Sequence, residues 1–171
     1  MINFENQIAT TREQSEKLLS LGVLPETADM VYHHTKSKTA ALEWELKPYP
    51  PTLRSTTKLN IARLASSLHK HPDGTTMTGE EVFDEIWGKD VPAWSLSRLI
   101  DMMPSEITID RTVGGLFISH IDISYFGFNS DKTISFLTGF SIGANETIFD
   151  ICIDMIDWLI KNRHFNKEYL K

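Results

Sequence analysis

Residues 146–162 have the sequence ETIFDICIDMIDWLIKN, which carries the strongest helical pattern of the chain. Its charged side chains Asp150, Asp154, Asp157 and Lys161 are spaced four, three and four residues apart, so they form one narrow polar stripe on a helix. Nearly all other positions of this stretch are apolar. A helix with so little polar surface is largely buried. The stretch therefore predicts a long C-terminal helix that packs against a sheet.

The residues before this helix alternate with a period of two, which is typical of β-strands. The pattern predicts strands over 106–111, 116–126 and 133–138, with turns at 114–115 and 129–131. Short connections of this kind favour antiparallel pairing. Together these segments predict an α+β fold, in which an antiparallel sheet packs against the C-terminal helix and further helices lie in the N-terminal and central parts.

The N-terminal third contains one helix and two short strands by the same criteria. Residues 10–21 are expected to be helical, with a capping box from either Thr10 or Thr11 and with Gly22 as the residue that ends the helix. Strands are expected over 30–34 and 42–47, because apolar and polar residues alternate in the second of these.

Residues 56–90 are predicted to form an αα-hairpin, an elaboration of a single α+β domain that spans residues 1–171. In its first helix, apolar residues recur at helical spacing and are expected to be buried. A capping box at Thr78 opens the second helix, which Gly88 ends, and Ser95 is the expected N-cap of a further helix. The apolar residues of the first helix are Ile61, Leu64, Ala65 and Leu68.

Composition places the chain among ordinary globular proteins, since 41% of its 171 residues are hydrophobic and 23% are charged. The single cysteine, Cys152, cannot form an internal disulfide, and its position in the apolar helix favours an inert buried thiol. The first residues lack the pattern of a signal peptide, and no segment is long and apolar enough to span a bilayer. We expect a soluble, cytoplasmic protein that does not associate with membranes.

The formal net charge of −6 argues against general nucleic-acid binding. Charge is unevenly distributed, however. Residues 36–72 hold seven Lys and Arg against two acids, whereas residues 73–157 hold four against fifteen. The preferred interpretation is that the two regions pair within the molecule. The alternative is a nucleic-acid interface in the basic region 36–72.

His120 and Asp122 form the most enzyme-like pair in the sequence. On one strand they point to the same face, and Ser124 continues the row, so the residue types suit a small hydrolase or a metal-dependent enzyme. Neighbours of this kind stand roughly 7 Å apart along a strand, which is too far for a catalytic hydrogen bond without rearrangement. The competing interpretation is that these residues lie on the solvated face of a sheet, and it is the one we prefer. No catalytic residue is therefore predicted, and His120 and Asp122 are the candidates if the protein is an enzyme.

Neither a metal nor a cofactor is predicted. The histidine clusters are His33-His34 and His69-x-His71, and neither has the spacing of three or four residues that is usual for ligands on one helix. The aspartate stripe of the last helix suits a solvated face better than a cation site. No glycine-rich loop has the spacing of a phosphate-binding motif.

The aromatic residues Trp44, Tyr49 and Trp94 are the candidates for a partner-binding surface, and burial in the core is their alternative interpretation. The sequence does not indicate any set of polar residues that meet at one site. The leading hypothesis is therefore a non-enzymatic binding or accessory protein, with another protein as its partner. A pocket that brought a histidine and a carboxylate within hydrogen-bonding distance would indicate an enzyme instead.

Three segments carry a resemblance to known sequences: 11–30, which begins TREQSEKLLSLG, PAWSLSRLI over 92–100, and DMIDWLIKN over 154–162. They resemble a group of small uncharacterised proteins from gut Bacteroides genomes, often in prophage-like or mobile regions. The resemblance implies a phage or mobile-element origin. The group has no assigned activity, so it supplies no functional residues.

Overall fold

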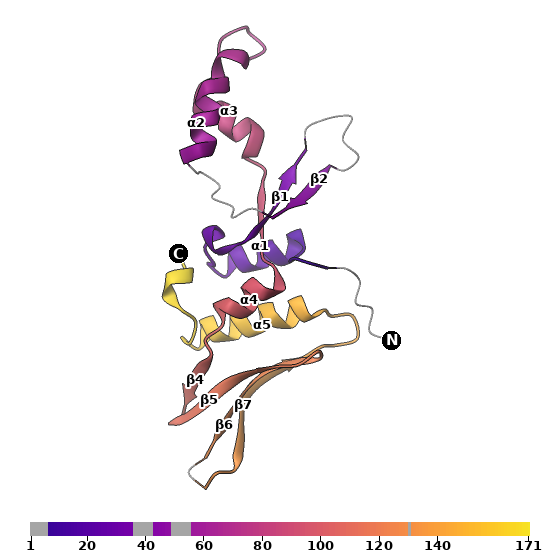
Figure 1. The fold of residues 1–171 in the computed structure, drawn as a ribbon, viewed down its shortest axis with the longest axis vertical. Coiled ribbons are helices and arrows are strands. Elements are labelled where there is room, and N and C mark those ends of the chain that lie inside the picture. The colour runs from indigo at the N-terminus through magenta and orange to yellow at the C-terminus, as the bar shows by residue number, and fades with distance from the viewer. Residues whose placement is uncertain (1–6, 36–42, 49–55, 130) are drawn as a thin grey trace. The chain divides into compact units, whose positions relative to one another are not determined.

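The computed structural model describes residues 7–35, 43–48, 56–129 and 131–171 (Figure 1). The chain divides into two compact units, each described here by itself. Unit 1 comprises Met1–Leu24 and Trp94–Lys171, and unit 2 comprises Pro25–Ala93. Within the described residues, no helix has both the length and the apolar character needed to cross a membrane.

Helix α5, Ile148–Lys161, forms the centre of unit 1 and confirms the predicted C-terminal helix. Its capping box joins Thr147 and Asp150: the Asp150 N–H donates to the Thr147 hydroxyl, and the Thr147 N–H donates to the Asp150 carboxylate at 2.7 Å. One side of α5 packs on a four-stranded sheet, and another side contacts α1 and α4 (Figure 1). Its buried side chains are Phe149, Ile151, Cys152, Ile153, Met155, Ile156 and Leu159.

The sheet of unit 1 is antiparallel throughout, with strand order β4-β5-β6-β7. This confirms the α+β class and the packing of the C-terminal helix on a sheet. The strands follow one another along the chain, as the short connections predicted. They are β4 Glu106–Ile109, β5 Thr112–Ile118, β6 Asp122–Phe128 and β7 Ile134–Ser141.

The predicted division of this region into three strands is wrong, because the structure has four. The turn expected at 114–115 lies at Asp110 and Arg111, which adopt positive φ angles of 47° and 69°. Two residues in that conformation form the hairpin turn that suits twisted strands. Gly114 instead lies inside β5, where an added Cβ would collide with Leu137. A side chain at this position would therefore have to displace the end of the Leu137 side chain.

Helices α1, Arg12–Ser20, and α4, Leu96–Met102, complete unit 1 with the short helix η3, Lys167–Tyr169. Of the two capping boxes predicted for α1, the one at Thr11 with Gln14 forms. Gly22 has a φ of 90° and ends the helix as expected, because its N–H and that of Val23 bond to the last free carbonyls. Ser95 caps α4 as predicted.

Unit 2 contains a three-stranded antiparallel sheet of order β2-β1-β3 and the short helix η1, Pro25–Thr27. Strand β1 is Met30–His34 and β2 is Trp44–Lys47, which confirms both predicted strands of this region. Strand β3, Val91–Ala93, was not predicted because it is short and contains Pro92. Its place at the edge of the sheet explains why a proline is tolerated there.

The predicted αα-hairpin is present in unit 2. It consists of α2, Thr56–Ala65, extended by η2, Ser66–Leu68, and of α3, Gly79–Trp87, capped by Thr78 as expected. Its core is Ala62, Val82 and Phe83, with Leu59 and Ala65 packed against it. The expected burial of Ile61, Leu64 and Leu68 is wrong, because α3 packs on the neighbouring stripe of α2 and leaves these three side chains exposed.

Candidate functional site

Asp90 occupies the centre of the candidate site, which lies wholly in unit 2. The strand register pairs Tyr32 with Val91, so its continuation by one residue places Asp90 opposite His33. Side chains in directly opposed positions of antiparallel strands lie within contact distance. A short edge strand thus brings together two residues that are far apart in the sequence.

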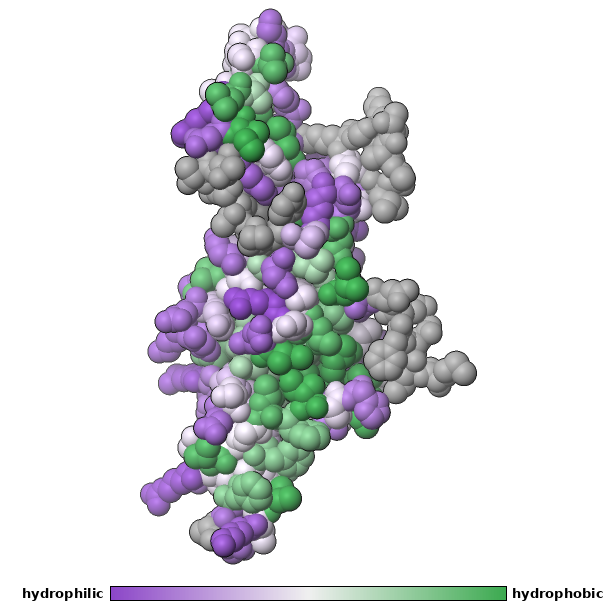
Figure 2. Space-filling view, in the orientation of Figure 1, coloured by the Kyte–Doolittle hydropathy of each residue, from purple (hydrophilic) through white to green (hydrophobic). Residues whose placement is uncertain are grey.

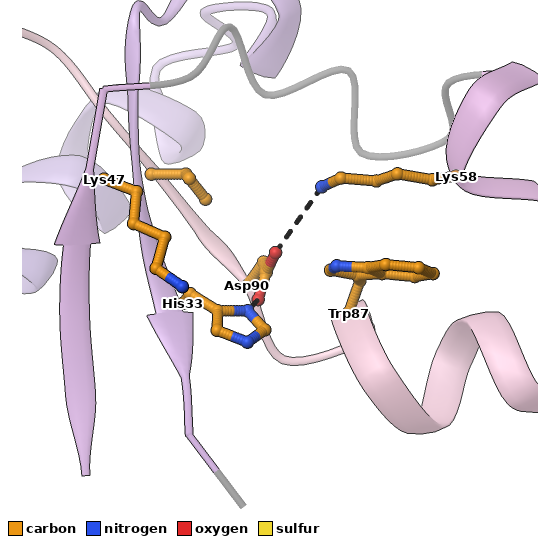
Figure 3. A pocket seen from close by; sticks show the side chains of 6 residues that line it. His33, Lys47, Lys58, Trp87 and Asp90 are labelled. Carbon is orange, nitrogen blue, oxygen red and sulfur yellow. Dashed lines mark hydrogen bonds and ion pairs between the residues drawn. The ribbon is translucent and has the colours of Figure 1, made fainter. Parts of the chain in front are cut away.

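The Asp90 carboxylate is buried, with 2% of its side chain exposed, and has two basic neighbours. Its Oδ1 lies 2.7 Å from Nδ1 of His33, and its Oδ2 lies 3.6 Å from Nζ of Lys58 (Figure 3). A buried carboxylate is strongly disfavoured unless it is paired and hydrogen-bonded. The Lys58–Asp90 pair is also one instance of internal pairing between the basic region 36–72 and the acidic region 73–157.

A cavity of about 140 Å³ opens beside Asp90. Lys58, from α2, extends along the Trp87 indole of α3, with its Nζ 5.5 Å from the ring centroid (Figure 3). A cation over an indole face is attracted by the π electrons, which holds the Lys58 side chain at the cavity. Lys47 approaches from β2 and pairs with Glu45 at 3.0 Å. The lining residues are Val31, His33, Lys47, Lys58, Trp87 and Asp90.

Two kinds of chemistry are available to this cavity. The ammonium groups of Lys47 and Lys58 attract an anion, and the flat Trp87 ring offers apolar surface to the rest of a ligand. Separately, a histidine oriented by a buried carboxylate is the usual arrangement of a general base. The described lining residues include no hydroxyl or thiol that this histidine could activate.

The structure does not bring His120 and Asp122 together on one strand. Residue 120 lies in the turn between β5 and β6, and Asp122 is the first residue of β6. His120 is exposed, and the described residues show no hydrogen bond or ion pair between the two side chains. The Ser119 hydroxyl accepts from the N–H groups of Ile121 and Asp122 and so holds the turn. The predicted strand over 116–126 is interrupted at this point.

The remaining histidines of the predicted clusters each have a carboxylate neighbour, but they do not converge. His34 lies 3.3 Å from Glu43, His69 lies 3.3 Å from Glu85, and His71 lies 3.4 Å from Glu81. Across the described ranges, no group of three or more His, Cys, Asp and Glu side chains could hold a metal ion.

The three aromatic candidates for a binding surface have different surroundings. Trp94 is fully buried in unit 1, so its assignment to a partner surface is wrong. Its backbone is anchored by the buried Thr10, whose hydroxyl accepts the Trp94 N–H at 3.0 Å. Trp44 is partly exposed and packs edge-to-face on His34 at 4.8 Å, and its binding role stays a prediction. Tyr49 lies outside the described residues.

Cys152 is buried within α5, and burial raises the pKa of its thiol to about 12. Only the thiolate reacts readily, so we expect a disulfide reagent at mildly alkaline pH to label the native chain at least about a hundredfold more slowly than the chain in urea. The pKa of the thiol in the unfolded chain is near 9.0. As the pH rises above 9.0, the thiol ionises in the unfolded chain but stays protonated in the folded chain, and this lowers the free energy of unfolding. Equal labelling rates in the two states would contradict the burial.

Apart from His33 and the two lysines, which belong to the basic region 36–72, the site residues were not singled out by the sequence, for a physical reason. Asp90, Lys58 and Trp87 meet His33 only because β3 pairs with β1 and the hairpin packs nearby. The proline in β3 conceals the strand, since proline within a run argues against a strand. The sequence did contain one indication of the site. The predicted helix that Gly88 ends places Trp87 and Asp90 close together at its C-terminus.

No protein-family model, curated protein or solved structure matches the chain. The resemblance to proteins of gut Bacteroides genomes therefore stays a prediction. What the site can bind has to be argued from its own charges and geometry.

Proposed function

We propose that the protein is a binding protein, and that the cavity beside Asp90 holds a small ligand with a carboxylate or phosphate group. The observation that supports this proposal is the excess of basic groups at the cavity. Lys47, Lys58 and His33 line it, whereas Asp90 is the one acid among the described lining residues and is already engaged by two of them. Lys47 also pairs with Glu45, whose side chain is half exposed and outside the described lining. A protein partner and a phage or mobile-element origin, expected from the sequence, stay predictions.

The geometry suits recognition of an oxyanion. Lysine ammonium groups are point charges that bind carboxylate and phosphate oxygens through charge-assisted hydrogen bonds. The site is partly buried, with 20% of the Lys58 side chain exposed, so water screens this attraction less than on an open surface. A volume of about 140 Å³ is below the usual range for drug-sized ligands, which favours a small anion or one end of a larger molecule.

General acid–base catalysis is the second candidate, and the His33–Asp90 contact at 2.7 Å favours it. It is the kind of contact that would indicate an enzyme. In this case His33 would take a proton from a bound substrate, and Asp90 would orient the imidazole and stabilise its charged form. This candidate replaces the pair His120 and Asp122 as the more plausible enzymatic arrangement, because a carboxylate and an imidazole are in contact here.

The proposal is tested by titrating the ¹⁵N-labelled chain with inorganic phosphate and with benzoate. Benzoate joins a carboxylate to a flat ring that suits Trp87. We expect saturable shifts of the Trp87 indole and Asp90 amide signals. Lys58→Met keeps the aliphatic stem but removes the charge, and should weaken binding about tenfold, equivalent to about 1.4 kcal/mol. Lys47→Met should act in the same direction.

Lys70→Met is the matched control, because Lys70 is an exposed lysine of unit 2 that does not line the cavity. It should bind both anions as the native chain does. The proposal is wrong if neither anion moves the signals of the cavity residues, or if Lys58→Met and Lys70→Met weaken binding equally. The second outcome would indicate general attraction to surface charge.

A further inference from the structure

The sheet of unit 1 has one face that its own helices do not cover. In Figure 1, α1, α4 and α5 lie on one side of strands β4–β7. The opposite side, here called the outer face, carries large apolar side chains that reach the surface, and Figure 2 shows hydrophobic side chains exposed over this part of the molecule. The outer face consists of Val113, Gly115, Phe117, Phe126, Phe128, Ile134 and Phe136.

Strand register places these residues together. Gly115 lies opposite Phe126, which in turn lies opposite Phe136, so β5, β6 and β7 contribute to one continuous row. The Phe126 ring packs edge-to-face on Phe117 at 6.0 Å and on Phe136 at 5.5 Å. Alternate residues such as Ile123 and Tyr125 point to the other face and are buried, as the period of a strand requires.

The exposure of this aromatic row is unusual. Phe128 is 70% exposed, Ile134 69% and Phe136 60%. At about 200 Å² for a fully exposed aromatic side chain, the outer face presents roughly 600 Å² of apolar surface. Contiguous apolar patches of this size on a single chain mark interaction sites.

We propose that the outer face is an interface with a second copy of this chain, formed by stacking of the two sheets. The area supports this occupant: a stable interface buries about 800 Å² per partner, and the outer face with a modest polar rim reaches that value. A two-fold dimer places the same patch on both sides, and aligned sheet stacking is a common way to bury two apolar faces.

Charge and shape support a self-complementary contact. The register places only two charged side chains of the described strands on this face, Glu106 on the edge strand and Asp122 at the start of β6, so its centre has no charge to repel a copy. Gly115 is exposed in this row, and an added Cβ there would meet nothing within 4 Å. A side chain of the second copy can therefore approach the backbone closely at this point.

A nucleic acid is disfavoured on the same grounds. Aromatic side chains on a sheet can stack on bases, but such surfaces are accompanied by cations that track the phosphates. Here the two charged groups on the strands of the face are both acids, Arg111 beside Phe128 is accompanied by Asp110 and Asp131, and the whole chain carries a net charge of −6. Binding to single strands is therefore an outcome of the test that would overturn the proposal.

The test is sedimentation equilibrium of the full chain from low to several hundred micromolar. We expect a concentration-dependent shift from the monomer mass of 19.5 kDa toward twice that mass. Phe136→Lys puts a charge in the centre of the interface and should weaken dimerisation at least about tenfold, with an unchanged circular dichroism spectrum. Gly115→Thr should also weaken it, because it adds a side chain to the middle of the face at a position where an added Cβ meets nothing in the monomer.

Leu68→Ser is the control, since Leu68 is also a largely exposed apolar residue, on η2 and outside the outer face. This variant should dimerise as the native chain does. A chain that stays monomeric at every concentration overturns the proposal, and so does a dimer that Phe136→Lys and Gly115→Thr leave intact. Binding of a labelled single-stranded oligonucleotide that is lost with Phe136→Lys in a monomeric chain would assign the face to nucleic acid instead.

Discussion

Leu159→Ala is expected to lower the free energy of unfolding of unit 1 by about 3 kcal/mol. Leu159 is fully buried in α5, the helix that lies between the sheet and helices α1 and α4. Truncation there removes apolar contacts and leaves a cavity. Because α5 is packed between the sheet on one side and α1 and α4 on another, neighbouring side chains cannot move far enough to fill this cavity. The loss is a large fraction of the stability of a typical domain.

The measurement is urea unfolding followed by circular dichroism at several wavelengths. Leu64→Ala is the matched control, because the chemical change is the same, the residue is also in a helix, and its exposed fraction is 81%. It should change stability by less than about 0.5 kcal/mol. Similar losses in both variants would mean that Leu159 is not packed as described.

Asp90→Asn is expected to lower the stability of unit 2 by about 2 kcal/mol. The amide keeps the shape of the carboxylate and can still accept one hydrogen bond from His33. It cannot supply the negative charge that balances Lys58, and the loss stays below the full value for a buried pair because His33 and Lys58 are about one-fifth exposed.

The same variant separates stability from binding. If the cavity binds an oxyanion, removal of the neighbouring negative charge should raise the affinity for benzoate several-fold, while thermal unfolding occurs at a lower temperature. Asp101→Asn, at an exposed carboxylate of unit 1, should change neither quantity. A folded Asp90→Asn variant that loses benzoate affinity would contradict the claim that the Asp90 charge opposes anion binding. It would favour a role for Asp90 in orienting His33.

Local pattern was sufficient wherever a residue's partner lies within a few positions along the chain. The capping boxes at Thr11 and Thr78 and the glycine that ends α1 formed as the sequence predicted. These features depend on hydrogen bonds between near neighbours. The apolar character of α5 likewise predicted its burial, because a helix without a wide polar face has to be covered.

The errors arose where two local patterns compete. Gly114 and Gly115 have the composition of a turn, yet the chain turns at Asp110 and Arg111, and the glycines lie within β5, where Gly114 packs closely against Leu137 and Gly115 is exposed. In α2 the helical spacing fits more than one stripe, and the contact with α3 selected Ala62 and its neighbours over Leu64 and Leu68.

Sequence alone determined the α+β class, most helix boundaries and the antiparallel character of the C-terminal sheet, whereas its division into four strands was not predicted. Only the tertiary structure decided the candidate site and the outer face. Asp90 meets His33 through the register of a three-residue edge strand, and four phenylalanines form one surface through the pairing of β5, β6 and β7. The reason is physical: helix caps and periodicity are local properties, whereas strand register depends on the packing of segments that are distant in the chain.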